Sequence, residues 1–136
     1  MIDKEIIKIA SNTENHGMLD NYTHFSKLKN AICGDEMKVY IIVQNNIVVK
    51  FKYECESCIY CQASVSLLSR KVKNKSVKKV KDFANQAKNA FSDKVSFDNE
   101  WKDFKKIITN NNIARKECLL LPINTTLDAL KNIDCI

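Results

Sequence analysis

The sequence predicts an α+β fold in which a small three-stranded antiparallel sheet packs against four to six helices. Three observations lead to this prediction: two β-rich runs separated by asparagines, apolar alternation in the second run, and apolar residues at helical spacing in most of the chain after the second run. The 136 residues include one proline and two glycines and no linker-like segment. We therefore expect residues 1–136 to form a single domain.

The first half of the chain contains the predicted strands. Residues 2–10 have the apolar spacing of a short helix, and residues 22–28 are a weak candidate for a strand. Residues 38–43 and 47–53 are rich in β-branched and aromatic side chains, and they are joined by asparagines, which tolerate the left-handed backbone of a tight hairpin turn. These strands predict one antiparallel sheet.

The second hairpin strand shows a period of two. We expect its buried face to consist of Ile47, Val49, Phe51 and Tyr53. Lys50 and Lys52 fall on the opposite face. Such alternation is typical of a sheet that is covered on one side, so helices must supply the cover.

Two helices are predicted directly after the hairpin. Residues 60–70 contain small side chains that permit close packing on the sheet. Ser76 has the position of an N-cap for a helix over residues 77–91, in which apolar residues recur on one face.

The last third of the chain predicts two further helical segments. After Ser96, apolar residues recur at helical spacing up to the asparagines at 110–112. These apolar residues are Phe97, Trp101, Phe104 and Ile108. We interpret this stripe as core packing. Residues 119–133 predict a final helix, with Pro122 in its first turns, where the missing N–H costs little.

The formal net charge of +6 arises from 22 basic and 16 acidic residues, and only Arg70 and Arg115 are arginines. Recognition of bases and phosphates in nucleic acids depends heavily on the arginine fork, so we expect no nucleic-acid partner. The chain opens without a signal-peptide pattern, and its apolar runs are far shorter than the roughly 20 residues of a membrane span. We expect a soluble, cytoplasmic protein without membrane contact.

Six cysteines in a chain without an export signal are poorly explained as disulfides, because the cytosol keeps thiols reduced. Clustered thiols in that compartment are typically metal-binding or catalytic. Cys135 is the next-to-last residue, and we assign it no role.

Three separated cysteines occupy positions that suit a metal ligand. Cys33 and Asp35 flank Gly34, and a tight turn there lets a thiolate and a carboxylate face the same ion. Cys58 falls at the junction of a strand and a helix, and Cys118 falls at the start of the last helix, where the helix dipole favours a thiolate.

A site built from Cys33, Asp35, Cys58 and Cys118 offers three soft sulfurs and one hard oxygen. Such ligands suit a tetrahedral Zn²⁺ ion or an iron–sulfur group. The carboxylate is the weaker partner for iron–sulfur chemistry, so the mixture favours transfer of the metal group over its storage.

A competing motif is the C-x-x-C-x-x-C run of Cys55, Cys58 and Cys61, which is typical of ferredoxin cluster ligands. No fourth cysteine follows at ferredoxin spacing, and a ferredoxin-like binding module is kept as an alternative.

The two histidines are His16 and His24. His16 lies in a turn that can approach the thiols, and we interpret it as structural.

Four segments of the chain, in this order, resemble the U-type iron–sulfur cluster assembly scaffolds, the family of IscU, SufU and the N-terminal domain of NifU. They are residues 15–20, 30–35, 58–66 and 115–121. The resemblance covers most of the chain and implies a SufE/IscU-like fold. It is closer to the SufU type, because residues 92–112 leave room for a helical insertion and Glu117 stands where IscU has a histidine.

The resemblance implies an assembly scaffold that is not an enzyme. Such a protein accepts sulfur from a cysteine desulfurase, binds iron, builds a transient [2Fe–2S] cluster and passes it to apo iron–sulfur proteins or carrier proteins. By resemblance the ligands are Cys33, Asp35, Cys58 and Cys118. SufU-type members instead hold Zn²⁺ and relay sulfur as a persulfide, so a zinc-dependent sulfurtransferase is the alternative. We expect Cys118, exposed at a helix start, to accept sulfur in a scaffold, and Cys33 to do so in a relay.

Overall fold

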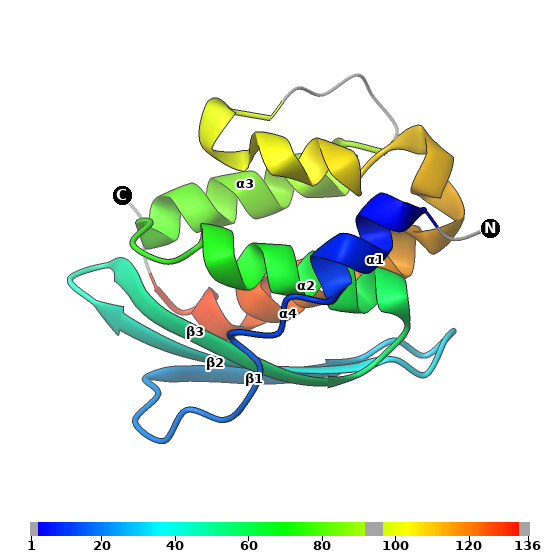
Figure 1. The fold of residues 1–136 in the computed structure, drawn as a ribbon. Coiled ribbons are helices and arrows are strands. Elements are labelled where there is room, and N and C mark those ends of the chain that lie inside the picture. The colour runs from blue at the N-terminus through cyan, green and yellow to red at the C-terminus, as the bar shows by residue number, and fades with distance from the viewer. Residues whose placement is uncertain (1–2, 92–96, 134–136) are drawn as a thin grey trace.

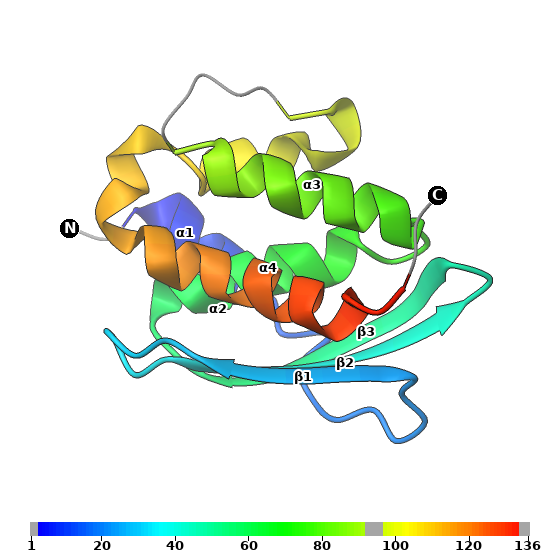
Figure 2. The same ribbon diagram turned by 180° about the vertical axis from the view of Figure 1, so that it is seen from behind.

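The computed structural model describes residues 3–91 and 97–133, and within them it confirms the predicted α+β fold. A three-stranded antiparallel sheet forms one layer, and the helices lie against one of its faces (Figure 1, Figure 2). The elements are α1 Lys4–Ala10, β1 His24–Lys29, β2 Glu36–Gln44, β3 Ile47–Glu56, α2 Ile59–Lys71, α3 Val77–Asn89, the 3₁₀ helices η1 Asn99–Lys106 and η2 Asn110–Arg115, and α4 Lys116–Leu130. Ile2, Cys135 and the first residues of the 92–112 segment lie outside the described residues.

None of the helices in the described ranges is both long enough and apolar enough to cross a lipid bilayer.

The three strands pair in the order β1-β2-β3. The turn between β2 and β3 has the predicted left-handed backbone, with φ of 52° at Asn45 and 61° at Asn46. Two successive residues with positive φ define the hairpin turn that matches the natural twist of a sheet.

The ladder between β2 and β3 contains one irregularity. Ile42 pairs with Lys50 and Val43 pairs with Val48, so Val49 has no partner across the ladder. This extra residue is a β-bulge. It changes which side chains face the helices on the two sides of the bulge.

The bulge corrects the predicted buried face of β3. Phe51 and Tyr53 are buried under the helices, as predicted. Before the bulge it is Val48 that is buried, at 1% exposure, whereas Ile47 and Val49 are half-buried. Alternation in the sequence does not reveal the change, because three adjacent β-branched residues fit either face equally well.

Loop segments cover the outer edge of β3 at two points. The Gly17 N–H donates to the Tyr53 carbonyl at 2.8 Å, and the Tyr53 N–H donates to the Asn15 carbonyl at 3.2 Å. Near the other end of the strand, Val48 exchanges hydrogen bonds of 2.7 and 2.9 Å with the turn at residues 74–75. The edge is therefore protected against pairing with another chain over most of its length.

Tyr40 lies on the face of the sheet that points away from the helices, and its hydroxyl donates a hydrogen bond to Glu54. This hydrogen bond, followed by burial, raises the pKa of Tyr40 from its ordinary value of 10.0 to about 12. Because the folded-state pKa is the higher one, the stabilisation is complete below pH 10.0 and is lost as the pH rises through about 12. We expect the ultraviolet titration of the native protein minus that of a Tyr40→Phe variant to show one tyrosinate forming near pH 12. A difference step near the ordinary tyrosine pKa would contradict the assigned hydrogen bond.

The two helices predicted after the hairpin are confirmed. Ser76 is the N-cap of α3, and its hydroxyl accepts a hydrogen bond from the Lys79 N–H at 3.1 Å. The apolar face predicted for this helix is buried. Phe91, predicted as its last residue, lies beyond the end of the helix but is buried as well.

The described part of the insertion forms 3₁₀ helices, which corrects the predicted α-helical segment. Trp101, Phe104 and Ile107 are all buried and recur every three residues, which is the period of a 3₁₀ helix. The interpretation of the apolar stripe as core is confirmed, because all four of its residues are buried. A second 3₁₀ helix, η2, begins where the sequence predicts the segment to end.

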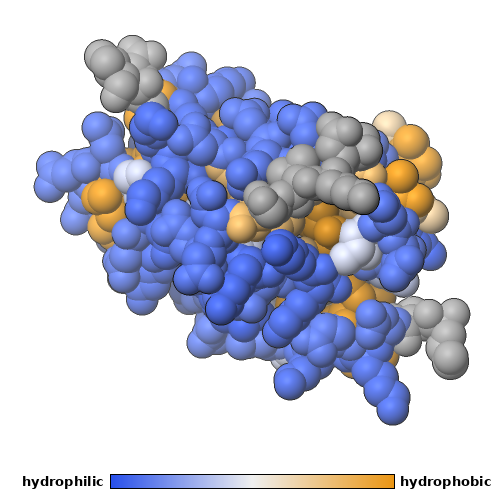
Figure 3. All heavy atoms as spheres, turned by 90° about the horizontal axis from the view of Figure 1, so that it is seen from above, coloured by the Kyte–Doolittle hydropathy of each residue, from blue (hydrophilic) through white to orange (hydrophobic). Residues whose placement is uncertain are grey.

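Aromatic side chains attach the insertion to α3. The Trp101 ring stacks on the Phe83 ring with a centroid distance of 4.3 Å, and the Phe104 ring lies 4.6 Å from the same ring. Both ribbon views show η1 running beside α3 (Figure 1, Figure 2). Seen from above, the helix side of the molecule is mostly hydrophilic, with apolar residues showing in small patches (Figure 3). The insertion thus buries apolar surface that α3 would otherwise expose.

Candidate metal centre

Cys33 and Asp35 lie in the loop that joins β1 to β2. The Gly34 N–H donates to the Asn30 carbonyl, and the Asn30 N–H donates to the Asp35 carbonyl, each at 2.7 Å. Gly34 has a φ of 75°, a left-handed value that glycine adopts at little cost. This tight turn places an exposed thiol and a buried carboxylate close together, as the sequence predicts.

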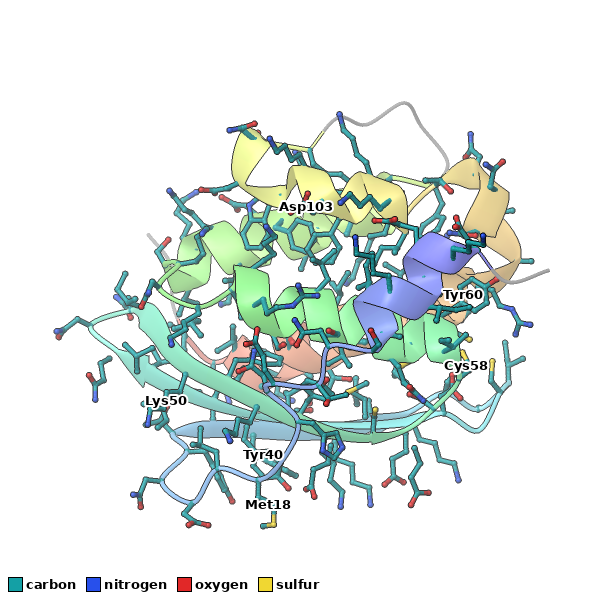
Figure 4. The ribbon with its side chains drawn as sticks, viewed as in Figure 1. Met18, Tyr40, Lys50, Cys58, Tyr60 and Asp103 are labelled. Atoms are coloured by element: carbon teal, nitrogen blue, oxygen red, sulfur yellow. The ribbon has the colours of Figure 1, made fainter. Side chains whose placement is uncertain are left out.

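Cys58 is the N-cap of α2, at the predicted junction between a strand and a helix. Its side chain makes no capping hydrogen bond, so the half-buried thiol is not committed to the helix. Its backbone N–H donates to Asp35 Oδ1 at 3.2 Å. The start of α2 is thereby joined directly to the loop that carries Cys33 and Asp35 (Figure 4).

Cys118 lies in the first turn of α4, which begins at Lys116 and not at the predicted Leu119. Pro122 is therefore the seventh residue of the helix, and its missing N–H leaves the Cys118 carbonyl without the usual helical partner. The Cys118 side chain is only 2% exposed, which corrects the expectation of an exposed thiol. The reason is that the apolar residues next along the helix draw the first turn of α4 into the core.

Three of the four predicted ligands converge. Cys33, Asp35 and Cys118 each offer one ligand atom within 4.8 Å of the other two, and the two sulfurs are 3.4 Å apart. Asp35 Oδ2 is buried and has no hydrogen-bond partner among the described residues. A buried carboxylate oxygen without a partner is costly, and a bound cation would satisfy it. The donor set therefore fits a metal ion or an iron–sulfur group.

The Cys58 thiol does not belong to this mutually close group. It still influences the group: burial raises the pKa of Cys118 most, and the neighbouring thiols of Cys33 and Cys58, followed by the Asp35 carboxylate, raise it further. The Cys118 thiol is therefore held protonated in the metal-free protein. Binding of a metal must displace that proton, since thiolate is the ligand.

The two additional cysteines of the C-x-x-C-x-x-C run lie elsewhere. Cys61 is fully buried in the core, and burial raises the pKa of its thiol. Cys55 is half-buried on β3, and burial raises its pKa as well. Within the described residues, neither belongs to a group of three or more close metal ligands. The geometry gives no support to a ferredoxin-like centre on this run.

The histidines are placed as structural residues. His16 forms an isolated bridge with Tyr53, and its ring meets the Tyr53 ring edge-on at a centroid distance of 5.4 Å. His24 lies on β1, where its Nδ1 atom is 2.8 Å from Thr23 Oγ1. In the part of the chain that is described, neither histidine joins the thiol group.

One contact beside the centre is missed by sequence reasoning. The Arg115 guanidinium lies over the Tyr60 ring at 5.2 Å, a cation–π contact. Arg115 is the N-cap of α4 and Tyr60 lies in the first turn of α2, so the pair joins the two helix starts that carry Cys118 and Cys58. No sequence pattern links residues so far apart.

The fold and the centre define a small α+β protein that gathers thiols and a carboxylate between a hairpin loop and two helix starts. The chain belongs to the NifU-like N-terminal domain family, whose family model matches residues 1–98. This match confirms the resemblance to U-type scaffolds. It includes Cys33, Asp35 and Cys58, whereas Cys118 lies beyond it.

Relatives cover nearly the whole chain. The iron–sulfur cluster assembly scaffold protein IscU of Thermotoga maritima is 30% identical over 139 residues, which cover 98% of this chain and 94% of that protein. A putative iron–sulfur cluster assembly scaffold protein for the SUF system, from Fervidobacterium islandicum, has a similar crystal structure, with a TM-score of 0.87, 25% identity and coverage of 95% and 96%. A NifU-like N-terminal protein from Brucella abortus also has a TM-score of 0.87, at 21% identity and coverage of 95% and 91%, and supports the fold alone.

Proposed function

We propose that this protein is an iron–sulfur cluster assembly scaffold that accepts sulfur from a cysteine desulfurase, binds iron and builds a labile [2Fe–2S] cluster. Residues 1–136 act as one scaffold domain, with Cys33, Asp35, Cys58 and Cys118 as the cluster ligands. The observation that carries this proposal is the convergence of two thiols on a buried carboxylate oxygen that has no partner among the described residues. Membership of the family supports it independently.

Exposure favours Cys33 as the thiol that receives sulfur first. Cys33 is exposed, whereas Cys118 is almost fully buried. We therefore assign the first acceptance to Cys33: its thiolate attacks the terminal sulfur of the desulfurase persulfide, and the desulfurase thiolate leaves. We propose that Cys118, whose sulfur lies 3.4 Å from that of Cys33, receives the sulfur next: its proton passes to the nearby Asp35 carboxylate, its thiolate attacks the outer sulfur of the Cys33 persulfide, and the Cys33 thiolate leaves.

In this proposal Asp35 is the exchangeable ligand of the site. Its Oδ1 atom is held by the Cys58 N–H, which leaves Oδ2 as the oxygen for iron. The Cys58 N–H already donates to Asp35, and we propose that the Cys58 thiol turns toward the group as the fourth ligand. One oxygen among three sulfurs favours delivery of the cluster to apo-proteins or carrier proteins.

A zinc-dependent sulfurtransferase is the second candidate, and the exposure of Cys33 beside the other donors is the observation that favours it. The same four residues can hold Zn²⁺ tetrahedrally, and the exposed Cys33 would then relay persulfide sulfur. In either case we propose a cytoplasmic setting, where free thiols stay reduced.

Metal analysis of protein purified without oxygen separates the two candidates. A cluster that reconstitutes with iron and sulfide, and moves to an apo-ferredoxin, supports the scaffold. Stoichiometric zinc that survives purification, together with zinc-dependent stimulation of a cysteine desulfurase, supports the relay. Protein that holds neither zinc nor a cluster would contradict both.

Removal of single ligands gives a sharper test. We expect Cys33→Ser, Cys58→Ser and Cys118→Ser each to abolish the visible absorption of a reconstituted cluster, because serine is a poor ligand for iron–sulfur cores. The control is the double variant Cys55→Ser with Cys61→Ala, which removes two thiols outside the centre and should keep the cluster. Loss of the cluster in the double variant alone would favour the ferredoxin-like alternative.

A further inference from the structure

A cavity of about 180 Å³ lies on the outer edge of β3. Lys50 and Lys52 line it from the strand, and Lys73 lines it from the turn that follows α2. Lys50 and Cys58 stand at opposite ends of the sheet (Figure 4). The cavity is therefore separate from the thiol centre, and none of the centre's predicted ligands lines it.

The backbone of Phe51 opens into this cavity. Tyr53 directs its N–H and carbonyl away from β2, toward Asn15 and Gly17. Pairs in an antiparallel ladder alternate between bonded and non-bonded, so Phe51, two residues earlier and opposite Ile41, also directs both groups outward. In agreement, the Ile41 carbonyl accepts from Thr23 on the other side of β2.

Neither backbone group of Phe51 has a hydrogen-bond partner on that edge among the described residues. The covering loops bond the strand on both sides of this point, at Val48 and at Tyr53, and leave Phe51 between them uncovered. One donor and one acceptor of the main chain are thus presented side by side at the cavity.

The charges around the cavity have one sign. Its lining contains three lysines and no acidic residue, and none of these lysines forms an ion pair with a described residue. The Asn15 side chain adds a further donor, because its amide uses one N–H on Ser69 Oγ, at 3.1 Å, and has a second N–H. The site therefore combines three positive charges with the main-chain N–H and carbonyl of Phe51 and the side-chain N–H of Asn15.

We propose that this cavity binds a phosphate ion. The oxygens of the anion accept from the Phe51 and Asn15 N–H groups and from the lysines, and its remaining O–H donates to the Phe51 carbonyl. Inorganic phosphate carries at least one O–H at neutral pH, whereas sulfate carries none, so the carbonyl distinguishes two ions of similar size. A cavity of about 180 Å³ admits such an ion and is below the range of about 300–1,000 Å³ typical of larger ligands.

Amide NMR titration of the whole chain tests the proposal without any metal. With inorganic phosphate at constant ionic strength, we expect a saturable shift of the Phe51 amide and of the Asn15 side-chain amide. Sulfate should bind at least about fivefold more weakly, because a site built to pair with a hydroxyl rejects a ligand that lacks it. Equal affinity for both ions, or no saturable shift at Phe51, would overturn the proposal.

Charge variants separate a built site from a general basic surface. Lys50→Gln and Lys73→Gln should each weaken phosphate binding by about fivefold or more, since each removes a charge-assisted hydrogen bond. Lys38→Gln is the matched control, because it removes the same charge from β2 outside this cavity. If all three variants weaken binding equally, the ion is held by the overall charge of the sheet and the proposal fails.

A phosphate monoester such as glycerol 2-phosphate, titrated in parallel, tests the role of the phosphate hydroxyl. Near neutral pH the monoester is mainly a dianion without an O–H on phosphorus, so inorganic phosphate should bind more tightly, and tighter binding of the monoester would overturn the assigned pairing with the Phe51 carbonyl. Because these measurements involve neither thiols nor iron, their outcome is independent of the proposed scaffold function.

Discussion

Asp35→Ala is expected to slow transfer of a reconstituted cluster to an apo-ferredoxin by at least about tenfold. In the proposed scaffold the carboxylate would leave the cluster and open the position that an incoming thiol must occupy. Its Oδ2 atom, buried and without a partner among the described residues, can also accept the proton of that thiol. Alanine offers neither an exchangeable ligand nor a proton acceptor. The measurement is the rate at which the spectrum of the recipient ferredoxin appears.

Asp35→Asn is the matched control for this prediction. Asparagine keeps an oxygen that can accept from the Cys58 N–H, but it has no negative charge and is a far weaker base. If the carboxylate acts as ligand and base, both variants transfer slowly. If only the alanine variant is slow, Asp35 acts by holding the start of α2, and the proposal that it is the exchangeable ligand is wrong.

Trp101→Ala is expected to lower the free energy of unfolding by about 3–5 kcal/mol. Trp101 is 2% exposed and stacks on Phe83, so truncation leaves a cavity between η1 and α3. It also removes the ring beneath the Lys75 ammonium, which lies 5.9 Å from the ring centroid. Urea denaturation followed by circular dichroism measures the loss. Fluorescence is unsuitable, because Trp101 is the one tryptophan of the chain.

Ile113→Ala provides the comparison within the same region. Ile113 is 55% exposed on η2, and its truncation should change stability by no more than about 0.5 kcal/mol. A loss below about 1 kcal/mol for Trp101→Ala would mean that the insertion is not part of the folded core. A large loss for Ile113→Ala would mean that η2 packs against something other than solvent.

Most of the fold is predictable from local patterns in the sequence. The asparagine turn, the Ser76 cap and the apolar face of α3 each depend on neighbouring residues, and each is confirmed. The errors have non-local causes. The bulge at Val49 depends on the partner strand, and α4 begins at Lys116, before the apolar run from which its start is predicted. The 3₁₀ form of η1 agrees with a three-residue repeat that is also compatible with an α-helix.

The candidate centre is predictable to a similar degree. Gly34 indicates the turn that joins Cys33 to Asp35, and the strand-to-helix junction places Cys58. The burial of Cys118 is not predictable, because it depends on how α4 packs against other elements. The contact between Tyr60 and Arg115 is likewise a product of three-dimensional packing between two helix starts.

The distance along the chain between the paired thiols of Cys33 and Cys118 has a consequence during protein synthesis. Cys33 and Cys118 are 85 residues apart, and at about 5–20 residues per second the ribosome needs roughly 4–17 s to pass from one to the other. Throughout that interval the nascent chain carries the hairpin-loop ligands without the thiol that completes them. In the proposed scaffold the centre would close only when α4 has left the ribosome and docked, so the site would be loaded after α4 has been synthesised.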